Sequence, residues 1–157
     1  MAGALLVVAP DLACAGEDQL PEDLRALRAG VGCGPVAGFF ERPGKVEPPY
    51  IYGVFPGEKE RSAAFWCEKG GDEKPYVLVV VEKGRVVAAI PWEVFPGGLS
   101  RQDASGEALS DFRYVDDPKR HGSSGKKTEY PALRSEYDGI ITLFYRYDEQ
   151  WLYQIFH

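Results

Sequence analysis

The feature that most constrains the fold is an apolar run from Tyr76 to Glu82, which Lys83-Gly84 separates from a second run, Arg85 to Trp92. A two-residue connection between strand-like runs predicts a tight β-hairpin. Both faces of the first arm are apolar, since Val77, Val79 and Val81 alternate with Tyr76, Leu78 and Val80. A strand of this kind needs cover on both sides. The sequence therefore predicts a central strand with a layer on each face of its sheet.

Other strands are expected at 50–55 and 63–67, and a second hairpin at 139–157. In that hairpin, Asp148-Glu149-Gln150 joins two runs that are rich in aromatic and β-branched residues. Its last strand is expected to belong to the core through Trp151, Tyr153, Ile155 and Phe156. The tetrapeptide at 54–57, Val-Phe-Pro-Gly, recurs at 94–97 and predicts a Pro-Gly turn in both places.

One short helix is expected before these strands. Pro21 suits a first turn, and Glu22 and Asp23 complement the positive end of the helix dipole. Leucines at 20, 24 and 27 share one face, and Gly30 is placed to end the helix. So short a helix is stabilised by docking rather than by propensity.

The elements together predict an α+β fold that is mainly antiparallel β-sheet. We expect about seven strands, with two hairpins and the N-terminal helix docked on them; a β-sandwich or small barrel is the alternative. Between 97 and 138 only Phe112–Val115 resembles a strand, so this region is expected to be irregular. Irregular stretches of this length are uncommon unless they carry function or move.

Residues 1–15 have the features of a cleavable signal peptide, which would leave a single β-rich domain at 16–157. The apolar run at 4–9 is followed by Ala13-Cys14-Ala15, an A-x-A step typical of a cleavage site. The run is too short to cross a bilayer, which takes about 20 apolar residues. No Lys or Arg precedes Arg25, however, so a buried N-terminal strand of a cytosolic protein is the alternative.

Export explains the cysteines. Cleavage after Ala15 would remove Cys14 and leave Cys33 and Cys67, which would join as a disulfide in an oxidising compartment. Two buried free thiols are the alternative in a cytosolic protein. We therefore expect a periplasmic or secreted protein.

The strongest local anomaly is a basic segment in an acidic chain. The net charge is −6, which argues against nucleic acid as the main partner. Five basic or potentially basic side chains nevertheless fall within 119–127, on a Gly/Ser-rich segment: Lys119, Arg120, His121, Lys126 and Lys127. Such a segment could bind a protein surface, an anionic glycan or a small anion; the alternative is a solvated loop. It does not match a P-loop, because Arg120 and Lys127 occupy positions that need Gly and Ser or Thr.

Catalytic and metal chemistry find little support. His121 could act as a general base oriented by Asp116 or Asp117, which would make the chain a small hydrolase or lyase. The cysteines and histidines match no zinc spacing, and no structural metal or cofactor is expected.

Aromatic residues offer a binding interpretation. Most of them are expected to fill the core, but Trp92 and Phe95 border the irregular region and are candidate contact residues. The favoured hypothesis is a non-enzymatic exported binding module, such as an inhibitor, immunity or accessory protein. It would bind its partner through 97–138 and these aromatic and basic residues.

Overall fold

The structure is a computed structural model that describes residues 20–36, 48–55, 61–71, 73–104, 106, 108–122, 125–128 and 130–157. The expected leader, 1–15, lies outside the described residues. No helix in the described part of the chain is long and apolar enough to cross a membrane.

One helix and twelve strands occur in the described residues. They are α1 (Glu22–Val31), β1 (Tyr50–Tyr52), β2 (Ala63–Glu68), β3 (Tyr76–Glu82), β4 (Arg85–Trp92), β5 (Gly98–Gln102), β6 (Ala108–Leu109), β7 (Phe112–Tyr114), β8 (His121–Gly122), β9 (Lys126–Lys127), β10 (Ala132–Tyr137), β11 (Ile140–Tyr147) and β12 (Gln150–Phe156). The expected α+β class with mainly antiparallel sheet is confirmed.

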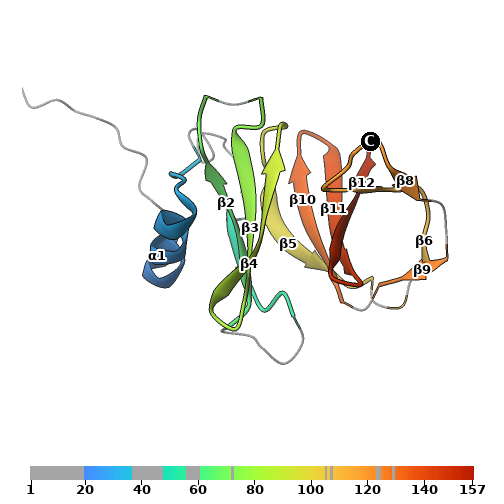
Figure 1. The fold of residues 1–157 in the computed structure, drawn as a ribbon, viewed down its shortest axis with the longest axis horizontal. Helices are drawn as coiled ribbons and strands as arrows, with labels where there is room; N and C mark the ends of the chain where they lie inside the picture. The colour runs from blue at the N-terminus through green and yellow to red at the C-terminus, as the bar shows by residue number, and fades with distance from the viewer. Residues whose placement is uncertain are drawn as a thin grey trace, which may run out of the picture.

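The elements form successive layers (Figure 1). Sheet A has four strands in the order β1-β2-β3-β4, and α1 covers its outer face. Sheet B has six strands in the order β5-β10-β11-β12-β7-β8 and packs against the inner face of sheet A. The two-stranded ladder of β6 and β9 lies beyond sheet B. The two sheets therefore face each other as in the sandwich that the sequence offered as an alternative.

The first hairpin is as expected. β3 pairs with β4 across Lys83-Gly84 and with β2 on its other side, so it is an interior strand. Val79 is buried in a cluster with the helix, whereas Leu78 and Val80 are buried in the cluster between the sheets. The alternation of two apolar sets thus corresponds to two core layers.

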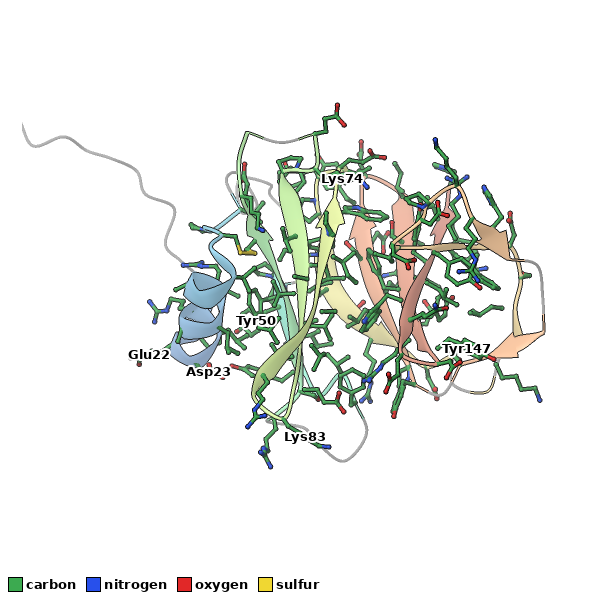
Figure 2. The ribbon with its side chains drawn as sticks, viewed as in Figure 1. Glu22, Asp23, Tyr50, Lys74, Lys83 and Tyr147 are labelled. Carbon is green, nitrogen blue, oxygen red and sulfur yellow. A yellow bond between two sulfur atoms is a disulfide. The ribbon has the colours of Figure 1, made fainter. Side chains whose placement is uncertain are left out.

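The helix α1 is fastened to sheet A at both ends. Near its start, the Tyr52 hydroxyl donates to the Asp23 carboxylate at 2.8 Å. Just past its end, Cys33 forms a disulfide with Cys67 of β2, with Cα atoms 5.7 Å apart. Figure 2 shows the yellow disulfide sulfurs at one end of α1 and the labelled Asp23 at the other. The helix runs one residue beyond the expected Gly30, and Gly32 ends it with φ of 75°.

The described part of 97–138 contains six strands, β5 to β10, so the expectation that only Phe112–Val115 resembles a strand was wrong. Within it, β5 and β10 pair with each other, and β10 also pairs with β11. Their sequences hide this role, because β5 contains only one large apolar residue, Leu99, and β10 places Ser135 in the interior. The buried Ser135 hydroxyl accepts a hydrogen bond from the Gly97 N–H at 3.0 Å, so a polar residue suits this core position.

The sandwich is joined along one side and pinned at one end. The Leu99 N–H donates to the Pro48 carbonyl at 3.0 Å, which links β5 to the segment before β1. The Arg146 guanidinium of β11 contacts the Glu82 carboxylate of β3 at 3.0 Å and ties the two sheets together. The opposite side, where β4 is the edge strand of sheet A, lacks a described link of this kind.

Candidate functional site

A groove of about 340 Å³ opens between the end of β4 and the surface of β12 and β7, and we call it the β4–β12 groove. Both β4 and β12 end at the top of the molecule as it is drawn in Figure 1. The apolar lining of the groove consists of Trp92, Val94, Ile140, Tyr153 and Ile155. Its polar lining consists of Asp111, Arg113, Thr142, Gln154 and His157.

The groove results from the unequal widths of the two sheets. Phe144, Tyr153, Arg113 and His121 are successive cross-strand partners from β11 to β8, so their side chains share the inner face of sheet B. The Trp92 ring at the end of β4 lies 5.0 Å from the Phe144 ring and 5.1 Å from the Tyr153 ring. Sheet A reaches no further along this row, and Arg113 and His121 remain exposed.

A close contact on the outer face of sheet B sets the position of β8. Phe112 of β7 is buried on that face, and its ring occupies the place that a Cβ at Gly122 would need. Only glycine lets β8 approach β7 in this way. The contact therefore fixes the strand that carries His121 beside the one that carries Arg113.

The apolar rim of the groove is unusually open. Val94 is 39% exposed and Ile155 is 40% exposed, although both are large apolar residues. Ile155, together with Phe156 at 44%, was expected to lie in the core, and this expectation was wrong. β7 pairs with β12 only at Leu152 and Tyr153, so the last residues of β12 extend past their neighbour on that side.

The loop before β7 is held by Gln154. Its amide nitrogen donates to the Ser110 carbonyl, and its amide oxygen accepts from the Tyr145 hydroxyl at 2.9 Å. Asp111 follows in this loop with φ of 50°, and its Oδ1 lies 3.9 Å from Nδ1 of His121. Both side chains are exposed, and the separation is longer than a hydrogen bond.

Comparisons with known proteins add nothing to this geometry. No protein-family model, curated protein or solved structure matches the chain.

The two aromatic candidates have different surroundings. Trp92 lines the groove. Phe95 instead packs its ring 5.6 Å from the Tyr76 ring and 4.9 Å from the Tyr137 ring. Trp92 therefore belongs to the candidate site, and Phe95 belongs to an aromatic cluster outside its lining.

The five basic residues of 119–127 do not share one element, and Lys119 and Arg120 lie in the connection before β8. His121 is on β8, which pairs with β7, whereas Lys126 and Lys127 form β9, which pairs with β6. Figure 1 shows β8 near the top of the molecule, at the end of sheet B, and β9 lower down in the ladder with β6. The Arg120 guanidinium lies 3.8 Å from the centre of the Tyr114 ring, on the face of sheet B away from the groove. His121 is paired with Arg113, which lines the groove.

The carboxylate close to His121 is a different one from the two that were proposed as its catalytic partners, Asp116 and Asp117. The carboxylate within 4 Å of His121 is that of Asp111, and the Asp117 carboxylate accepts from the Lys119 N–H at 3.3 Å. The enzyme hypothesis stays a prediction. Among the residues that the structure describes, no group of three or more His, Cys, Asp or Glu could hold a metal ion.

The sequence did not point to Arg113, Val94 or Ile155. The alternation of Phe112, Arg113 and Tyr114 was a usable signal, because it places Arg113 on the face opposite two aromatic residues. The sequence could not show that β7 pairs with β12, and it therefore could not show which residues Arg113 faces.

Proposed function

We propose that this chain is an exported binding module that recognises a partner protein through the β4–β12 groove. The observation that carries the proposal is the open apolar rim, where Val94 and Ile155 flank the half-buried Trp92. Apolar side chains that stay exposed around a tryptophan are typical of protein interfaces, in which Trp is among the strongest anchors. The role would be that of an inhibitor, immunity or accessory protein.

A protein partner fits this lining better than an anionic glycan or a small anion does. A glycan or an inorganic anion is held mainly by charged and hydrogen-bonding groups. Here half of the lining is apolar, and Ile140 and Ile155 come from neighbouring strands of one rigid sheet. A protein side chain could bury against these residues and gain free energy by leaving water.

Export to the periplasm or outside the cell is the second part of the proposal. It is supported by the leader-like residues 1–15 and by the disulfide between Cys33 and Cys67. Disulfides persist in oxidising compartments and are rare in the cytosol of most organisms.

Site-specific photo-crosslinking tests the surface. The photoreactive residue p-benzoylphenylalanine is placed at Ile155 or at Val94, and at Val87 as a control, since Val87 is 46% exposed on β4 and does not line the groove. In native envelope extract, we expect one discrete adduct from the two groove positions and not from Val87. Adding Trp92→Ala should weaken the adduct about tenfold or more. Equal labelling from all three positions, or none from the groove, contradicts the proposal.

Intact mass of the native protein tests export. We expect a chain that lacks residues 1–15 and is lighter by two hydrogens, as a disulfide requires. A chain that begins at Met1, with Cys33 and Cys67 as titratable thiols, contradicts this part of the proposal.

A further inference from the structure

The groove contains one cation without a described counterpart. No described residue gives the Arg113 guanidinium an ion pair or a hydrogen bond, whereas Arg146 contacts Glu82 and Arg120 stacks on Tyr114. Arg113 nevertheless lines the groove, beside Tyr153 in the register of sheet B. Arg113 therefore borders the space that a partner would occupy.

The groove also contains one acidic residue, Asp111, which lies close to His121 of β8. Asp111 Oδ1 lies 3.9 Å from His121 Nδ1 on the neighbouring strand β8. Toward β12, Arg113 is paired with Tyr153, and Ile155, two residues further along β12, belongs to the apolar rim of the same groove. The groove therefore offers a cation directly beside an apolar surface.

We infer that the partner segment which occupies the β4–β12 groove carries a carboxylate next to an apolar side chain, and that Arg113 binds this carboxylate. The inference rests on the proposed function and names the chemistry of the partner. The apolar side chain lies against Val94 and Ile155, and the carboxylate accepts hydrogen bonds from the guanidinium. An arginine suits this role because its planar fork matches the two oxygens of a carboxylate.

A pair of small probes isolates the two interactions. N-acetyl-leucine has an isobutyl side chain beside a carboxylate, and N-acetyl-leucinamide has the same side chain beside a neutral amide. Each probe is titrated into the full chain while the indole N–H signal of Trp92 and the Arg113 Nε–H signal are followed by NMR. We expect N-acetyl-leucine to shift both signals and to bind about tenfold more tightly than the amide, a difference of about 1.4 kcal/mol.

Variants assign the preference to one residue. Arg113→Gln should remove the preference for the carboxylate while weak binding of both probes remains. Arg85→Gln, at the distant start of β4, should leave the preference unchanged. Raising the salt concentration to about 1 M should also reduce it in the unsubstituted chain, because the Debye length falls to about 3 Å. Equal affinity for the two probes, or a preference that survives in Arg113→Gln, overturns the inference.

The result is separable from the test of the proposed function. If crosslinking at Ile155 persists but the probes bind equally, the groove binds a partner of other chemistry and only the inference fails. If the probes discriminate but no adduct forms at Ile155, the carboxylate site stands and the protein-binding proposal fails.

Discussion

At the scale of single residues, Gly97 is required by a neighbour rather than by its own conformation. It precedes β5 where the chain passes close to β10, and a Cβ at this position would overlap the backbone of Glu136. Its N–H is used by the buried Ser135 hydroxyl. From the sequence, Pro96-Gly97 was predicted to form a turn, but the glycine is needed because the backbone of Glu136 lies so close.

Replacing Gly97 by alanine should therefore destabilise the protein. We expect the free energy of unfolding to fall by about 2 kcal/mol or more, because the backbone of β10 cannot move aside without disturbing its pairs. Gly30→Ala is the control, since no atom lies within 4 Å of a Cβ there and alanine favours a helix by about 1 kcal/mol. Urea denaturation measures both, and equal effects would contradict the explanation.

Tyr52 shows a second effect of a single side chain. Burial, and then the hydrogen bond to Asp23, raise the pKa of Tyr52 from 10.0 to about 12. Because the folded-state pKa lies above the unfolded value, the resulting stabilisation is complete below pH 10 and is lost as the pH rises through about 12.

Stability above pH 10 should therefore depend on Tyr52. We expect the free energy of unfolding to fall less steeply between pH 10 and 12 in Tyr52→Phe than in the unsubstituted chain, because phenylalanine has no proton to lose. Tyr147→Phe, at the end of β11 on sheet B (Figure 2), serves as control and should keep the original slope. Identical slopes in all three proteins would show that the Tyr52–Asp23 contact has no part in this loss.

At the scale of elements, the sequence predicted those with strong hydrophobic patterns and missed those with weak ones. The hairpin of β3 and β4, the hairpin of β11 and β12, and α1 with its docking face all follow from local apolar spacing. β5 and β10 could not be read, because β5 has one large apolar residue, β10 carries three polar residues in a row, and the place of each in the sheet depends on partners distant in sequence. Burial of Ser135 is a tertiary effect that no local pattern carries.

The disulfide holds a whole element in place, because it joins the end of α1 to β2 of sheet A. Cys67 is fully buried in the cluster that α1 covers, alongside Phe65 and Val79. The sequence predicted the pairing of Cys33 with Cys67 from the even pair of cysteines that cleavage of the expected leader would leave.

Removing the disulfide should cost about 3–4 kcal/mol of unfolding free energy, as chain entropy predicts for a loop closed by residues 34 apart. Reduction of the unsubstituted chain and the double variant Cys33→Ala/Cys67→Ala should both show a loss of this size in urea denaturation. Helical circular dichroism should decline before the β signal, since α1 loses one of its two fastenings. Unchanged stability after complete reduction would contradict the expected role.

At the scale of the whole molecule, the candidate site depends on how many strands each sheet has. Trp92 was identified from its place beside a weakly patterned region, and it does line the groove. Arg113, Val94 and Ile155 join it because β7 and β8 extend sheet B beyond β4. That difference in width is a property of the complete topology, which explains why the sequence did not reveal it.

Truncations of β12 should separate its core part from its groove part. Deleting 150–157 should abolish folding, because β12 lies between β11 and β7 and carries the buried Leu152 and Tyr153. Deleting only 155–157 should leave a folded chain, because Ile155 and Phe156 are 40% and 44% exposed. The shorter deletion should nevertheless abolish the adduct that forms from a photoreactive residue at Val94. Dispersed NMR spectra report folding in each case, and a folded product of the longer deletion would contradict this division.

The order of strands in sheet B also governs when the fold can be completed. Sheet A is built from consecutive strands and has all its pairs by Trp92. β5 must wait for β10, and β7 must wait for β12, the final strand. A chain that emerges from a ribosome or a translocation pore would thus pair sheet A first, then β5, β10 and β11, and would join β7 and β8 to sheet B only after β12 had emerged.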